Sequence, residues 1–231
     1  MIKKVCLVFL ALVVILLAAA GVAWKLNGER WQQEYAAFRK TGAPVLMYHA
    51  VGPEEGADWP RTLIMKPELF EAHLQYLKEQ GYTIVTVAEL AERLQQGKSV
   101  DKYVALSFDD GYKNNHSVVL PLLQKYDAKG SFFVINRDIG DELHMNEQEI
   151  KELIAAGMEL GSHTYSHNPL AAIDEKYLVW ETDTSRYWLK KKFDGYIVRT
   201  LAYPNGSYND RVIDAAKKYG FYRALTGHVG V

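Results

Sequence analysis

The chain has 231 residues, of which 48% are hydrophobic and 24% are charged, and its formal net charge is −1. This is the composition of a globular protein, and the small net charge excludes a protein that binds nucleic acid through an overall basic field. The single cysteine, Cys6, excludes a fold that is stabilised by disulfides.

The N-terminus has the features of a membrane or export segment. Lys3 and Lys4 precede an apolar run from Val5 to Trp24, which reaches the ~20 residues that cross a bilayer. We therefore predict that residues 1–24 form a hydrophobic helix, either a membrane anchor or a signal peptide that is cleaved near Ala20. Because both lysines precede the run, the positive-inside rule places the rest of the chain outside the cytoplasm, anchored in the cytoplasmic membrane or secreted to the cell envelope.

Residues 25–42 are polar and aromatic, and the aromatic side chains follow a helical spacing. We predict a stalk helix there, followed by a domain over residues 43–231. In this domain, apolar runs predict a buried strand at 44–49 and further strands at 82–85, 103–108, 131–135, 158–162, 198–202 and 222–226. Amphipathic patterns predict helices at 67–80, 87–96, 114–126, 146–156, 174–192 and 209–219.

This alternation of strands and helices implies right-handed parallel units and an α/β fold. About seven such strands suit a (β/α) barrel, complete or incomplete, and a doubly wound sheet is the alternative. Both folds place a functional site at the carboxyl ends of the strands.

The first polar group stands at the end of the strand 103–108 and has the sequence SFDDGY, from Ser107 to Tyr112. Adjacent carboxylates after a buried strand are costly unless they are paired or bind a metal. Asp110 is therefore a candidate metal ligand, and Asp109 is a candidate base. A helix cap with a turn is the alternative, because Asp and Gly are common where a strand leads into a helix.

The second polar group contains His163 and His167, which follow the strand 158–162. Histidines at i and i+4 can bind one metal if the residues between them form a turn, and a pair of surface histidines is the alternative. Thr164 stands where zinc proteases with this spacing have glutamate, which excludes that class. With Asp110, the two imidazoles make a ligand set with open positions for a water and a substrate oxygen, as hydrolysis requires. One divalent metal ion is predicted, with zinc favoured and cobalt, nickel and iron as alternatives.

The third polar group has the sequence LAYPNGSY, from Leu201 to Tyr208, and follows the strand 198–202. Its Pro-Asn-Gly segment is a turn signal. The turn is either only a connection or a source of a backbone N–H that points into the site as an oxyanion donor.

In this order, the three groups resemble the motifs of the polysaccharide deacetylase family, which is carbohydrate esterase family 4 or the NodB-homology domain. Ser107 to Gly111 matches [ST]-F-D-D-G, His163 to His167 matches H-[ST]-x-x-H, and Leu201 to Tyr208 is similar to F-A-Y-P-x-G-x-Y. The segment from Pro44 to His49, and the later Phe70 and Gly81-Tyr82-Thr83, look like the opening of the subgroup that contains poly-N-acetylglucosamine deacetylases.

The resemblance, which extends from about Pro44 to Thr226, implies a deformed (β/α) barrel. It also implies metal-dependent removal of N-acetyl groups, less often O-acetyl groups, from a polysaccharide of the peptidoglycan or poly-N-acetylglucosamine type. Carried over by motif position, the base is Asp109 and the metal ligands are Asp110, His163 and His167. The backbone N–H of Asn205 helps to hold the oxyanion, and Tyr203 and Pro204 contact the substrate. The implied partners are an N-acetylated polysaccharide and, through the N-terminal segment, the membrane, but not nucleic acid. The sequence indicates no oligomeric state.

Two positions depart from the family pattern. Ala202 stands where many relatives have an arginine that contacts the base, and Arg199, three residues earlier on the same strand, points to the opposite face. The later L-x-x-x-H-like motif, whose histidine is the general acid, has no counterpart. His228 is the only histidine downstream, and Gly227 and Gly230 give it the character of a loop residue. We expect a domain that is shortened at its C-terminal end. Two alternatives stay open: a catalytically impaired, metal-containing polysaccharide-binding protein, and a metal-dependent hydrolase of a non-carbohydrate amide.

Overall fold

The computed structural model of the protein describes residues 43–52 and 63–227, which belong to one compact unit. The predicted membrane segment (1–24) and stalk helix (25–42) lie outside the described residues, so both stay predictions. Within 43–52 and 63–227, no helix has the length and apolarity that crossing a bilayer requires.

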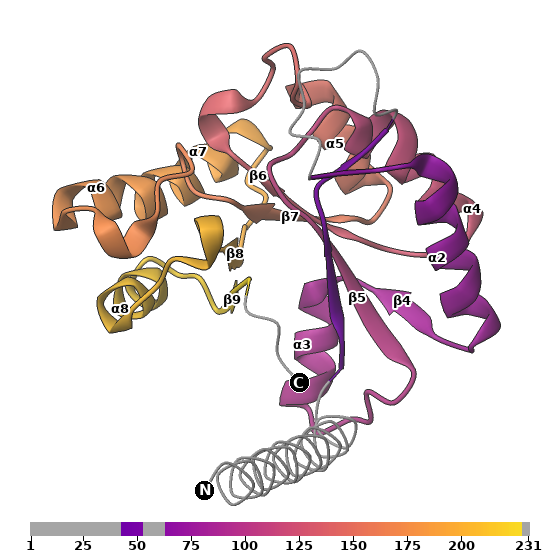
Figure 1. Ribbon diagram of the computed structural model, residues 1–231. Coiled ribbons are helices and arrows are strands. Elements are labelled where there is room, and N and C mark those ends of the chain that lie inside the picture. The colour runs from indigo at the N-terminus through magenta and orange to yellow at the C-terminus, as the bar shows by residue number, and fades with distance from the viewer. Residues whose placement is uncertain (1–42, 53–62, 228–231) are drawn as a thin grey trace, which may run out of the picture. The chain divides into compact units, whose positions relative to one another are not determined.

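Seven parallel strands form one curled sheet in the spatial order β1-β5-β6-β7-β8-β9, with β4 paired to the first half of β5 (Figure 1). The strands are β1 (Val45–Tyr48), β4 (Thr83–Val85), β5 (Tyr103–Phe108), β6 (Ser131–Val134), β7 (Glu159–Ser162), β8 (Thr200–Ala202) and β9 (Arg223–Leu225). From β5 to β9, neighbours in the sheet are also neighbours in the sequence, as in a barrel rather than a doubly wound sheet. The sheet has β1 and β9 as its two ends, so the predicted deformed (β/α) barrel of about seven strands is confirmed.

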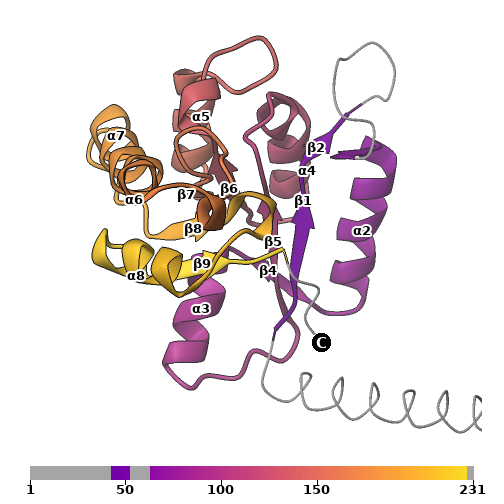
Figure 2. The same ribbon diagram turned by 60° about the vertical axis from the view of Figure 1, so that its left-hand side comes forward.

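Helices cover the outer face of this sheet (Figure 2). They are α2 (Pro67–Glu79), α4 (Leu120–Lys125), α5 (Glu147–Ala155), α6 (Glu175–Val179), α7 (Ser185–Lys192) and α8 (Asp210–Lys218). Their buried side chains share one core with alternate residues of the strands, in which the rings of Phe108 and Phe132 stack 4.8 Å apart. Burying each such side chain stabilises the fold by roughly 1.5–3 kcal/mol, so this layer supplies most of the hydrophobic stabilisation.

The remaining helix, α3 (Val87–Gln95), packs against the inner face of the sheet. The carboxylate of Glu159 accepts hydrogen bonds from the Ala88 N–H (2.9 Å), the Ser131 hydroxyl (2.6 Å) and the Thr200 hydroxyl (2.5 Å). Glu159, Ser131 and Thr200 are the first residues of β7, β6 and β8. Because an anion is favourable at a helix N-terminus, this network fixes α3 at the amino end of the strands. The carboxyl ends are left for a site.

Two predictions about the elements need correction. The strand 44–49 was expected to be buried, but Met47 is 55% exposed. The reason is that β1 is an end strand of the sheet: it pairs with β5 on one edge, and among the described residues no strand of this sheet pairs with its other edge. The helices at 114–126 and 174–192 begin and end within one residue of the predicted bounds, but neither is a uniform α-helix. Each contains a π-helical turn, at Asn115–Val119 and at Trp180–Thr184. A short strand pair, β2 (Ala50–Val51) and β3 (Ile64–Met65), was not predicted.

Candidate metal centre

The first polar group forms a sharp turn at the carboxyl end of β5. The Asp109 N–H donates to the Tyr48 carbonyl (2.9 Å), which joins the ends of β5 and β1. Asp110 and Gly111 then adopt left-handed backbone conformations, with φ of 70° and 82°. Both carboxylates are buried, at 7% exposure for Asp109 and 8% for Asp110.

The second polar group is a tight loop after β7. Thr164 and His167 both have left-handed conformations, with φ of 69° and 61°. The Thr164 hydroxyl accepts a hydrogen bond from the His167 N–H (3.1 Å), so the chain folds back on itself between the two histidines. This turn brings the rings of His163 and His167 to a centroid distance of 4.7 Å.

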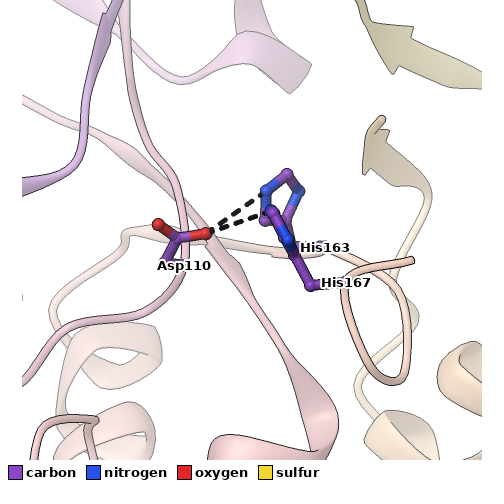
Figure 3. Close-up of side chains that lie close together, drawn as sticks. All are labelled: Asp110, His163 and His167. Carbon is purple, nitrogen blue, oxygen red and sulfur yellow. Dashed lines mark ion pairs between the residues drawn. The ribbon is translucent and has the colours of Figure 1, made fainter. Parts of the chain in front are cut away.

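Asp110, His163 and His167 meet at one point, as Figure 3 shows. The Nε2 atoms of His163 and His167 lie 3.4 and 3.5 Å from the same oxygen, Oδ1 of Asp110. Zinc held tetrahedrally by N and O ligands separates the ligand atoms by roughly 3.3–3.6 Å. Oδ1 of Asp110 is buried and has no hydrogen-bond partner among the described residues, which a cation at this point would correct. The three residues therefore fit a divalent metal ion.

His163 is prepared for ligation by its surroundings. Its Nδ1 lies 2.9 Å from the carbonyl oxygen of Ala202, at the end of β8, so Nδ1 carries the proton and Nε2 has a free lone pair. Burial lowers the pKa of His163 to about 4, so the imidazole is neutral at pH 7. A neutral ring with a fixed tautomer is the form that binds metals.

Asp109 lies beside this cluster but is not part of it. Burial, and secondarily the charge of Asp110, raise the pKa of Asp109 to about 7. Its Oδ1 is buried with no hydrogen-bond partner in the described part of the chain. A carboxyl group whose pKa lies near neutrality can both accept and release a proton, which suits a general base.

The third polar group follows β8. Asn205 is exposed and left-handed, with φ of 54°. Tyr203 and Pro204, predicted to contact the substrate, are buried, and the ring of Tyr203 stacks on that of Tyr208 at 5.3 Å. The roles predicted for Asn205, Tyr203 and Pro204 stay predictions.

Backbone strain gathers in these three groups. Seven described residues other than glycine have a positive φ, and four of them are Asp110, Thr164, His167 and Asn205. Such conformations cost on the order of 1–3 kcal/mol each and persist only where the surroundings enforce them. For threonine, which is β-branched, the conformation is a clear outlier. The fold therefore spends stability on the geometry of this site.

Neither Ala202 nor Arg199 places an arginine side chain beside the candidate base. Ala202 is buried in the inner cluster with α3. Arg199 directly precedes the amino end of β8, whereas the candidate ligands follow the carboxyl ends of their strands. Its guanidinium lies 5.6 Å from the ring centroid of Tyr222. His228 lies outside the described residues.

A further histidine, His49, lies near the cluster. His49 directly follows β1. The pKa of its imidazole is lowered, mainly by burial; the charge of Asp110 opposes this shift and His167 adds to it. His49 therefore lies near two of the candidate ligands, Asp110 and His167. Its position at the end of the first strand predicts a residue that lines the site without binding the metal.

Known proteins share this chain's sequence and fold. The profile of the polysaccharide deacetylase family matches residues 96–224. The Bacillus subtilis protein YxkH is 32% identical over 191 residues, which cover 81% of this chain and 65% of that protein. The poly-β-1,6-N-acetyl-D-glucosamine N-deacetylase of Staphylococcus aureus is 28% identical over 165 residues, which cover 65% of this chain and 57% of that protein. The chain thus spans less than two thirds of the length of these relatives.

A solved structure has a similar fold. The Streptococcus pyogenes deacetylase PplD, in complex with acetate, superposes with a TM-score of 0.70 and is 32% identical. The match covers 78% of this chain and 80% of PplD.

Proposed function

The chain belongs to the polysaccharide deacetylase family, and from this premise we propose that it is a metal-dependent hydrolase that removes N-acetyl groups from a polysaccharide of the cell envelope. The observation that carries the proposal is the convergence of the Asp110, His163 and His167 side chains beside a buried carboxylate, Asp109. Such a ligand set leaves positions open for a water and for a substrate oxygen.

Asp109 and Asn205 have separate roles in the proposed reaction. When bound, the metal ion supplies a Lewis acid that polarises the amide carbonyl and lowers the pKa of water. Asp109 accepts a proton as the water oxygen attacks the carbonyl carbon. The backbone N–H of Asn205 donates to the oxygen that becomes negative. Asp109 then returns its proton to the amide nitrogen as the C–N bond breaks. The products are a free amine and acetic acid, which keeps the second proton of the water and ionises to acetate.

The relatives support the substrate class. A Staphylococcus aureus relative is named as a deacetylase of poly-β-1,6-N-acetyl-D-glucosamine. The similar PplD structure holds acetate, the acid that removal of an acetyl group releases. We propose that the substrate is an N-acetylated amino-sugar polymer of the poly-N-acetylglucosamine or peptidoglycan type, and that zinc is the metal.

Acetate release tests this proposal. Purified protein with zinc is expected to release acetate from poly-β-1,6-N-acetylglucosamine, peptidoglycan or chitin oligomers. A chelator should reduce the release to background, and added zinc should restore it, because the Lewis acid and the lowered pKa of the attacking water would be lost with the cation. Binding of the polymers without release would instead support the impaired binding protein. A folded, metal-loaded protein that neither binds nor cleaves any amino sugar would favour the hydrolase of another amide.

We also propose that the domain acts outside the cytoplasm, because Lys3 and Lys4 precede the apolar run of residues 5–24. Protease added to whole protoplasts is expected to digest the domain while cytoplasmic proteins stay intact. A domain that is protected in intact protoplasts and soluble after lysis would contradict the proposal. A soluble exported form would indicate cleavage of the segment near Ala20.

A further inference from the structure

A buried carboxylate stands behind the loop that carries the two histidines. Glu181 is 2% exposed and lies in the π-helical turn Trp180–Thr184, between α6 and α7. It accepts hydrogen bonds from the Ser166 N–H (2.8 Å), the Ser166 hydroxyl and the Asn168 side-chain amide (3.0 Å). Ser166 and Asn168 are the neighbours of His167 in the chain. Glu181 therefore bonds to the chain on both sides of one candidate ligand, through the backbone and hydroxyl of Ser166 and through the side chain of Asn168.

The start of α7, directly after this turn, anchors the other end of the loop. The hydroxyl of Ser185, the first residue of α7, lies 2.7 Å from that of Ser162, which accepts a hydrogen bond from the Thr164 N–H (3.0 Å). Asn136 accepts a further bond from the Ser185 hydroxyl (2.8 Å). The loop from His163 to Asn168 is thus fixed at both ends by side chains from one face of a helix. A π-helical turn widens the helix by one residue and is frequent at functional sites.

A charged acceptor suits this position. The loop presents three donors to one side chain, and hydrogen bonds to a carboxylate are roughly twice as strong as those to a neutral acceptor. Thr164 and His167 are held in costly left-handed conformations. Stabilisation from outside the loop is therefore needed to keep His167 aimed at Asp110 when no metal is bound.

We infer that Glu181 is a positioning residue for the metal centre: it holds the loop so that the Nε2 atom of His167 faces Asp110. The inference rests on the proposed function for its role in catalysis, but the contact between Glu181 and the loop does not. Among the described residues, Glu181 bonds to Ser166 and Asn168 and not to the side chains of the candidate ligands, so its effect passes to His167 through these two neighbours.

Substitution of Glu181 by glutamine tests the inference, because glutamine keeps the size of the side chain but removes the charge and brings an amide N–H₂ against the donors. Asp183→Asn is the matched control, since Asp183 is exposed in the same π-helical turn and loses the same charge. Cobalt affinity is measured by competition with a chelating dye, together with the cobalt absorption spectrum. We expect Glu181→Gln to weaken the affinity about 10–100-fold, the range found for residues that orient metal ligands. The spectrum should change as well, whereas Asp183→Asn should leave both unaltered.

Hydrogen–deuterium exchange of the metal-free protein supplies a second measurement. We expect faster exchange over residues 163–168 in Glu181→Gln but not in Asp183→Asn. Should Glu181→Gln not fold, Asn168→Ala, which removes one donor from an exposed residue, should show a smaller change of the same kind. Cobalt affinity, spectrum and loop exchange that all match those of the unmodified protein would overturn the inference. Metal affinity that depends on Glu181, in an unmodified protein that releases no acetate from any amino-sugar polymer, would instead overturn the proposed function alone.

Discussion

Replacing both His163 and His167 with alanine is expected to abolish stoichiometric metal binding. The unmodified domain should retain about one divalent ion per chain after dialysis, and the double variant close to none, because Asp110 alone is a single carboxylate ligand. Elemental analysis of the dialysed proteins measures the difference. His116→Ala is the control, since His116 pairs with Glu152 (2.7 Å) and is not part of the cluster.

The double variant must be shown to be folded. His163 is fully buried, and its loss leaves the Ala202 carbonyl without its 2.9 Å partner, at a cost of about 1–3 kcal/mol. Circular dichroism should nevertheless report a native secondary structure, because the outer core does not include either histidine. Full metal occupancy in a folded double variant would show that the ligand assignment is wrong.

Asp109→Asn is expected to lower turnover by roughly 10²–10⁴, the usual contribution of a general base. Asparagine has the size of aspartate but cannot accept the proton from water, whereas the metal ligands remain in place. Asp110→Asn should act differently and chiefly weaken metal affinity, because Oδ1 of Asp110 is the atom that faces both imidazoles.

Acetate release and metal content, measured on the same preparations, distinguish the two carboxylates. The expected pattern is an inactive Asp109→Asn protein with its metal and an Asp110→Asn protein that has lost it. Metal loss in Asp109→Asn with retention in Asp110→Asn would reverse the two roles. Turnover of Asp109→Asn within a few-fold of the unmodified protein would remove Asp109 from the mechanism.

The sequence was sufficient for the order of the seven strands of the main sheet and their helices, and for the residues of the cluster. Alternating strands and helices have different periodicities, and the carboxyl ends of parallel strands lie at one edge, so Asp110 and His163 could be brought together without coordinates. Their exact spacing could not be predicted, because it depends on the left-handed conformation of Thr164, which threonine disfavours locally.

Features set by distant contacts were missed or wrongly predicted. The exposure of Met47 follows from the position of β1 at an end of the sheet. The sequence of a single strand does not determine which strands pair with it, so this position could not be predicted. The role of Glu181 required knowing which loop faces α6 and α7. A signal was present, however, since Glu181 and Ser185 share a helix face with the buried Leu178 and Leu189, where apolar residues are expected.

The hydrogen-bond network between Glu159 and α3 bears on the order of folding and metal binding. It closes the amino end of the barrel with side chains and backbone of the chain itself, at the opposite end of the strands from the metal ligands. The outer core likewise contains none of those ligands. Folding therefore does not have to wait for an ion, unlike in a zinc finger, where the metal supplies the folding energy. The chain can therefore fold as an apoprotein before any ion binds to the candidate ligands.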